Sequence, residues 1–213
     1  MRLIDNLIAL PKFLSPERLQ CFRTEVSNCR SSADRVHIPG HKRGETISYK
    51  RLRLHTKEIV AFYQSSELRG LISEIAGLEV KPTPLRDQSS CSVLIYDRPG
   101  DHIGWHYDYN FYNGRHFTVL LSLVNEHLFD QCLSSAKLLV KKPARHEEIP
   151  TPANTLVMFE GVRVCHQVTP LGECERRIIL SMTFCADPTT TPLRDLERRI
   201  KDTAYFGLRA LTT

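Results

Sequence analysis

Three stretches of the chain alternate between apolar and polar side chains with the period of two that is typical of β-strands. They span residues 90–96, 116–123 and 176–184. In each stretch one face is almost wholly apolar, whereas the other is mixed. The mixed faces carry Ser90, Ser92, Leu94 and Tyr96; His116, Thr118, Leu120 and Ser122; and Arg177, Ile179, Ser181 and Thr183. The pattern predicts a barrel or sandwich whose mixed faces line a functional interior.

The outer parts of the chain show helical periodicity instead. One helix is predicted to begin at Ser15-Pro16-Glu17, a second to run from Ser66 to a stop at Gly77, and a third to follow Thr191-Pro192. We expect their buried faces to consist of Leu19, Phe22 and Val26; of Leu68, Leu71, Ile72 and Ile75; and of Leu193, Leu196 and Ile200. With no repeat or linker, the sequence predicts one domain over residues 1–213. Its helical N-terminal part (about 1–88) and C-terminal helix (about 191–205) would flank a β core (about 89–186).

Composition is consistent with a single domain that buries a sizeable core, since 41% of the 213 residues are hydrophobic. No apolar stretch is long enough to cross a membrane, and the charge at Asp5 argues against a signal peptide. Seven cysteines, an odd number without a Cys-x-x-Cys pair, indicate reduced thiols. We therefore predict a cytoplasmic protein.

The net charge of +5 is modest, but basic residues cluster in residues 41–57, "HKRGETISYKRLRLHTK". This run is typical of a solvated loop and helix face. It is also compatible with a site for an anionic substrate or a nucleic acid. No aromatic ladder accompanies it, which disfavours nucleic acid as a partner.

The candidate chemistry lies in "GWHYDYN" and "GVRVCHQVTP", which contain His106, Asp108 and His166. On a strand, residues i and i+2 point to the same side, so His106 and Asp108 can reach one metal ion. His166 would come from a neighbouring segment. Two histidines and one carboxylate hold Fe(II) by one face in non-heme oxygenases. A surface His-Asp pair that binds nothing is the alternative.

Two arginines precede the apolar run "IILSMTF". By strand parity Arg177 shares the mixed face and would project inward, where its guanidinium can bind a carboxylate through two hydrogen bonds. Alternatively, Arg176 and Arg177 both lie in water at the end of the strand.

In this order, "YDRPGDHIGWHYD", "HFTVLLSL", "NTLVMFEG" and "HQVTPLGECERRIILSMTF" resemble the core of the Fe(II)/2-oxoglutarate-dependent dioxygenases. The most similar branch is the prolyl-4-hydroxylase-like one, and the resemblance covers roughly residues 90–185. It implies a mainly β fold with flanking helices, namely a double-stranded β-helix (jelly-roll or cupin-like) core. It also implies Fe(II) as cofactor and 2-oxoglutarate and O2 as co-substrates.

Carried over residue by residue, the resemblance makes His106, Asp108 and His166 the Fe(II) ligands. Many relatives place the basic residue that binds 2-oxoglutarate at the spacing of Arg176. The strand-face argument and the "RIILSMTF" ending favour Arg177, which we predict. Tyr96 and Thr118 match further positions that contact 2-oxoglutarate in this family. The loop before His106 is one residue longer here than in some relatives.

The implied reaction is hydroxylation of an unactivated C–H bond with release of succinate and CO2. The chain also resembles a clade of free-amino-acid hydroxylases and halogenases. The halogenases lack the carboxylate ligand and bind chloride there. Because Asp108 is present, the sequence favours hydroxylation. Protein or peptide (prolyl-type) hydroxylation, and a non-catalytic metal-binding β-barrel module, remain the alternatives.

The substrate is expected to be a small molecule such as a free amino acid, and the sequence does not indicate an oligomeric state. Candidate substrate contacts are the polar residues of the loop after Asp108 and of the inward strand face, namely Asn110, Asn113, Arg115, Ser181 and Thr183. The loop could equally be an ordinary polar turn at Asn113-Gly114. Trp105, which has the opposite parity to the ligands, is predicted to pack, and Cys165 is predicted not to bind the metal.

Overall fold

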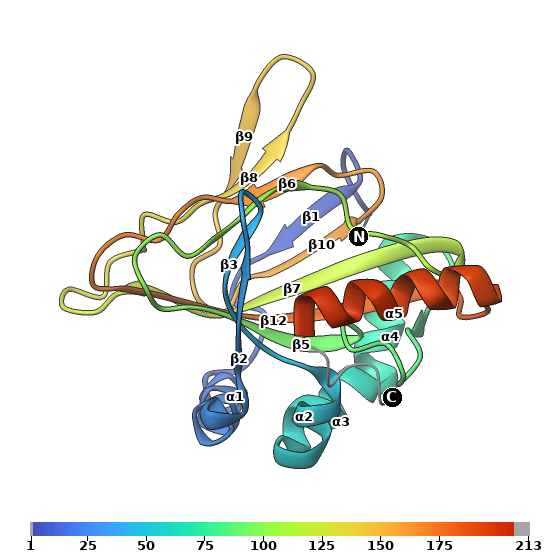
Figure 1. Cartoon of the computed structure of the whole chain (residues 1–213), viewed down its shortest axis with the longest axis horizontal. Helices are drawn as coiled ribbons and strands as arrows, with labels where there is room; N and C mark the ends of the chain where they lie inside the picture. The colour runs from blue at the N-terminus through green and yellow to red at the C-terminus, as the bar shows by residue number, and fades with distance from the viewer. Residues whose placement is uncertain (1, 207–213) are drawn as a thin grey trace.

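The computed structural model describes residues 2–206 as a large curled sheet flanked by helices (Figure 1). The sheet order is β1-β10-β7-β12-β5-β3-β6-β11-β8-β9, and β2 and β4 pair with β3 and β12. Every strand pairing is antiparallel. The strands are β1 (Leu7–Leu10), β2 (Asp34–Ile38), β3 (Lys42–Ile47), β4 (Lys81–Pro82), β5 (Cys91–Tyr96), β6 (His102–His106), β7 (Asn113–His127), β8 (Leu138–Lys141), β9 (His146–Ile149), β10 (Leu156–Glu160), β11 (His166–Val168) and β12 (Glu175–Asp187).

The helices gather around the layer formed by β5, β12 and β7 (Figure 1). They are α1 (Pro16–Asn28), α2 (Tyr49–His55), α3 (Lys57–Gln64), α4 (Ser66–Ala76) and α5 (Pro192–Phe206), with one short 3-10 turn (Arg30–Ser32). The larger of the apolar clusters packs α1 to α4 against the outward face of this layer. A second cluster fills part of the space between the layer and β6, β8, β10 and β11.

The predicted strand faces are confirmed. The apolar side chains Val93, Val119 and Leu180 lie in the cluster under the helices. The opposite faces of β5, β7 and β12 line an internal cavity, to which they contribute Ser92, Leu94, Tyr96, His116, Thr118, Leu120, Arg177, Ile179, Ser181 and Thr183. Strand alternation therefore separates the core of this protein from its interior chamber.

The first two predicted helices are also confirmed. Ser15 caps α1, since its hydroxyl accepts a hydrogen bond from the backbone N–H of Arg18 (3.3 Å), and Phe22 and Val26 are buried. Helix α4 ends at Gly77, which adopts a left-handed conformation with φ of 70° that glycine tolerates without steric cost.

The predicted inward face of α5 is wrong. Leu193, Leu196 and Ile200 are exposed by 66%, 55% and 63%, whereas Arg198 and Asp202 are buried. Arg198 Nη1 donates to Asp202 Oδ2 at 2.7 Å within this helix. A buried ion pair, and not the apolar stripe, faces the rest of the protein.

The N-terminal part is less purely helical than predicted. Residues 1–88 also supply β1 to β4, and β3 joins β5 to β6 in the middle of the sheet. The basic run at residues 41–57 therefore lies mostly on β3 and α2. Among the described residues, no helix has the length and apolar character needed to span a bilayer.

Candidate active site

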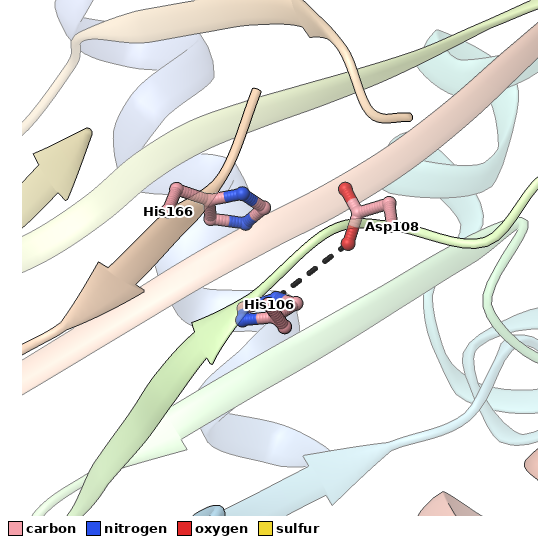
Figure 2. Close-up of side chains that lie close together, drawn as sticks. All are labelled: His106, Asp108 and His166. Atoms are coloured by element: carbon pink, nitrogen blue, oxygen red, sulfur yellow. Dashed lines mark ion pairs between the residues drawn. The ribbon is translucent and has the colours of Figure 1, made fainter. Parts of the chain in front are cut away.

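Two adjacent strands bring the candidate ligands together (Figure 2). His106 ends β6 and His166 begins β11, and these residues are direct cross-strand partners with ring centroids 4.2 Å apart. Asp108 follows β6 by two residues, and its Oδ1 lies 3.6 Å from His106 Nε2. One potential ligand atom from each of the three residues lies within 4.8 Å of the others. This spacing suits coordination of one ion from one side.

Hydrogen bonds to the backbone orient both imidazoles. Nδ1 of His106 lies 2.7 Å from the carbonyl oxygen of Gly104, and Nδ1 of His166 lies 3.0 Å from that of Val164. A carbonyl oxygen can only accept, so each Nδ1 carries a proton, and Nε2 is the ring atom of each histidine that is left to bind a metal. Burial, followed by the nearby His166, lowers the pKa of His106 to about 4, which keeps this ring neutral at physiological pH.

Asp108 is fixed from two sides. Its Oδ2 accepts a hydrogen bond from the Thr118 hydroxyl at 2.5 Å, and its backbone N–H donates to the carbonyl oxygen of Gly161 at 3.1 Å. Burial raises the pKa of this carboxyl, but the two imidazoles and the Thr118 hydroxyl outweigh burial, and the net shift is downward. The carboxylate is therefore ionised, as a metal ligand must be.

These ligands open onto a cavity of about 840 Å³, which lies in the volume range of small-molecule sites. Arg177 lies in its wall and is only 1% exposed. Its Nη1 donates to the Thr151 hydroxyl at 2.9 Å, while its Nε has no hydrogen-bond partner in the described part of the chain. Burial lowers the pKa of Arg177 to about 10, which leaves it charged at neutral pH.

Tyr96 lies directly across the β5–β12 ladder from Arg177. Its buried hydroxyl likewise lacks a partner within residues 2–206. A buried guanidinium beside an unpaired hydroxyl costs stability unless an acceptor binds there. The two side chains thus form a ready site for a carboxylate.

Arg176 points the other way and forms an ion pair with Glu126 at 3.1 Å. Of the two arginines, only Arg177 lines the cavity.

The tentative substrate residues divide into two groups. Ser181, Thr183 and Asn110 line the cavity. Asn113 and Arg115 do not. The side chain of Asn113 donates to the Thr189 hydroxyl, and Arg115 pairs with Glu160 at 2.9 Å. The last two residues are engaged in structural contacts on the outside of the chamber.

Trp105, which was expected only to pack, also lines the cavity, with its ring 4.7 Å from that of His146. Cys165 is absent from the group of potential ligands in residues 2–206.

Sequence reasoning missed the part of the cavity wall made by β3 and α5. This wall includes His41, Lys42, Lys201 and Tyr205. His41 Nε2 lies 2.6 Å from the Tyr205 hydroxyl, and the His41 ring lies 5.7 Å from the His106 ring. The basic run carried a signal for Lys42, but α5 could not be placed over the chamber from its sequence.

One family model and several solved structures match this chain. The Halogenase D (HalD) family model matches residues 5–113, about half of the chain. No curated protein sequence matches it.

Solved structures match over most of the chain. SnoN, a non-heme alpha ketoglutarate dependent epimerase from nogalamycin biosynthesis, has a TM-score of 0.70 at 12% identity, with 90% of this chain and 82% of SnoN covered. A Pseudomonas putida prolyl-4-hydroxylase has a TM-score of 0.59 at 15% identity, with coverages of 84% and 91%.

HygX from Streptomyces hygroscopicus, solved with nickel, 2-oxoglutarate and hygromycin B, has a TM-score of 0.61 at 8% identity, with coverages of 84% and 82%. At these identities the likeness concerns the fold. The predicted double-stranded β-helix with flanking helices is confirmed.

Proposed function

The chain belongs to the Halogenase D (HalD) family, and from this premise we propose that it is an Fe(II)- and 2-oxoglutarate-dependent dioxygenase. In this proposal it hydroxylates an unactivated C–H bond of a small molecule, such as a free amino acid, and releases succinate and CO2. The observation that carries the proposal is the pairing of two features in one cavity. These are the group His106, Asp108 and His166, and the buried, unpaired Arg177.

The three ligand residues fit Fe(II) because they offer two imidazole nitrogens and one carboxylate oxygen within 4.8 Å of one another. The backbone carbonyls that hold both Nδ1 protons make the free nitrogens better electron donors. The other side of the ion would face the cavity, which leaves room for 2-oxoglutarate and O2.

Arg177 and Tyr96 fit the far carboxylate of 2-oxoglutarate. The guanidinium supplies charge-assisted donors, and the Tyr96 hydroxyl, which has no partner among the described residues, supplies another. We assign Thr118 to holding Asp108, because its hydroxyl already donates to that carboxylate. Arg176 is left without a role at the cavity.

Bound iron and 2-oxoglutarate together supply the oxidising power for C–H hydroxylation. The chain's own residues orient both groups and exclude water. Apolar side chains such as Leu94, Leu120 and Ile179 line the same chamber as the metal ligands and Arg177. Such walls keep the reaction away from solvent and hold the substrate carbon at a fixed position.

Asp108 favours hydroxylation over halogenation. A chloride ligand would need the position that this carboxylate fills, where the Thr118 hydroxyl donates to the carboxylate and the carbonyl of Gly161 accepts the backbone N–H of Asp108. The cavity volume of about 840 Å³ lies in the range of small-molecule sites, which favours a small substrate over a protein segment.

Anaerobic addition of Fe(II) and 2-oxoglutarate tests the proposal. We expect an absorption band that requires both, followed by succinate release when O2 is admitted, and stimulation of this release by the correct amino acid. His106→Ala and Asp108→Ala should abolish the band, while Arg176→Ala, on the outer face, serves as the matched control. A wild-type protein without a 2-oxoglutarate-dependent band would refute the oxygenase function.

A further inference from the structure

Lys42 is a buried cation without a counter-charge. It projects from β3 into the cavity wall and is 3% exposed. Its ammonium lies 4.8 Å from the centre of the Tyr205 ring, but it has no hydrogen bond or ion pair within residues 2–206. Buried charges in proteins are almost always paired, because an unpaired one loses its hydration without compensation.

The surroundings of Lys42 make the unpaired charge more costly. Burial, followed by the positive charge of Lys201, lowers the pKa of Lys42 to about 7. His41 and Tyr205 are hydrogen bonded to each other beside it and carry no negative charge at neutral pH. No carboxylate of the described residues compensates this ammonium.

The other cations near the cavity are accounted for. Lys201 Nζ lies 3.6 Å from Asp87 and 3.1 Å from Asp202, and Arg198 bonds Asp202 at 2.7 Å. These two cations and two carboxylates balance one another. Lys42 lies outside this cluster of paired charges.

The proposed cofactors do not neutralise Lys42 either. Fe(II) and Arg177 together carry three positive charges, and Asp108 and the 2-oxoglutarate dianion carry three negative ones. The charged group that acts on Lys42 is Lys201, whereas the group that acts on Arg177 is Tyr96. The two cations come from different strands, Lys42 from β3 and Arg177 from β12.

The position of Lys42 is suited to substrate. Lys42 pairs across the β3–β6 ladder with Ile103, on the strand that ends at His106. The preceding residue, His41, packs its ring edge-on against the His106 ring. An anion held by Lys42 would thus lie on the side of the chamber next to the metal ligands.

We infer that the substrate carries an anionic group, a carboxylate or a phosphate, and that the Lys42 ammonium binds it. This inference rests on the proposed function and adds the charge of the substrate and the residue that selects it. Lys42 is then a specificity-determining residue, distinct from Arg177, which serves the co-substrate.

The test measures anion binding by calorimetry at pH 6.5 on the full chain loaded anaerobically with Fe(II) and saturating 2-oxoglutarate. The probes are propionate, inorganic phosphate and, as the cationic counterpart, propylamine. We expect propionate or phosphate to bind wild type about tenfold more tightly than Lys42→Met, the loss of one charge-assisted contact. Lys42→Arg should restore binding, and propylamine should bind neither protein.

Lys141→Met, at an exposed lysine on β8, is the matched control and should bind the anions like wild type. The 2-oxoglutarate-dependent absorption band should be unchanged in Lys42→Met. Anion binding that is absent from wild type or equal in Lys42→Met would overturn the inference. Loss of the band in Lys42→Met would also overturn it, because Lys42 would then serve 2-oxoglutarate. If wild type itself lacks the 2-oxoglutarate-dependent absorption band, the proposed oxygenase function fails, which is a different outcome from failure of the Lys42 inference.

Discussion

Replacing Gly161 by alanine should displace the carboxylate ligand Asp108 although none of the three ligand residues is itself substituted. Gly161 directly follows β10, and its carbonyl accepts the backbone N–H of Asp108. A Cβ built on Gly161 would lie 2.6 Å from the Cβ of Asp108, 3.2 Å from the Thr118 hydroxyl oxygen and 3.3 Å from Asp108 Oδ2. All three atoms belong to the carboxylate ligand or to the hydroxyl that holds it.

The size of the effect follows from these distances. Ordinary contacts of a Cβ begin at 3.4 Å, so the Asp108 side chain or the Gly161 backbone must move by about 0.8 Å, the difference between 3.4 and 2.6 Å. The atom met is a Cβ close to the backbone, which cannot swing away as the end of a long side chain can. Disturbing the groups that hold metal ligands typically costs about 10- to 100-fold in metal affinity. We expect a loss in this range for Gly161→Ala.

Anaerobic competition of Fe(II) against a chelating dye measures this affinity, and circular dichroism checks that the variant is folded. Gly70→Ala is the matched control, since a Cβ at Gly70 meets nothing within 4 Å on the exposed face of α4. That variant should bind Fe(II) like wild type and gain about 0.5–1 kcal/mol of stability from its helical alanine. Wild-type Fe(II) affinity in a folded Gly161→Ala protein would refute the reasoning.

Three further predictions concern charged residues. Arg177→Gln should weaken 2-oxoglutarate binding about 10- to 100-fold, whereas Arg176→Gln should leave it unchanged, as measured by titration of the absorption band. Lys42→Met should be more stable than wild type at pH 7 by a few kcal/mol. The pKa of Lys42 is about 7 in the folded protein and 10.5 in the unfolded chain, so the unfolded chain binds more protons between these pH values. The stability of wild type should therefore rise from pH 7 to 10.5. Urea unfolding curves that keep a constant gap up to pH 10 would contradict this. Arg198→Ala should lower the unfolding free energy by about 3–5 kcal/mol, because it removes one partner of a buried ion pair. Ile200→Ser, at an exposed position, should change it by less than about 0.5 kcal/mol. Equal effects of the two substitutions in thermal unfolding would contradict our assignment of the buried face of α5.

The sheet and the candidate ligands could be predicted from sequence because both depend on local spacing. Strand parity assigned Arg177 to the interior. Arg177 and Ile179 share the face that lines the cavity, whereas Ile178 between them packs against the core under the helices, so three successive residues carry this information. The same parity placed His106 and Asp108 on one side. These features need no knowledge of distant contacts, whereas the place of His166 beside them depends on the pairing of β6 with β11.

Helix α5 could not be predicted in this way. Its spacing of Leu193, Leu196 and Ile200 is the normal signature of a buried helical face. Arg198 and Asp202 occupy the buried face instead, since Arg198 also donates to the carbonyl oxygen of Arg86 at 2.8 Å. That acceptor lies in another part of the chain, and no local pattern shows that it will be near.

The polar groups of the interior differ in how fully they are hydrogen bonded. The Thr183 hydroxyl pairs with Thr83 at 2.7 Å, and the Asn125 amide donates to the carbonyl oxygen of Thr151 at 2.9 Å. Such groups have their partners already and stabilise the folded chain. Arg177 Nε and the Tyr96 hydroxyl lack partners among the described residues. Folding leaves the cost of burying these two groups unrecovered until a ligand binds, which makes Arg177 and Tyr96 candidates for binding an anion in the cavity.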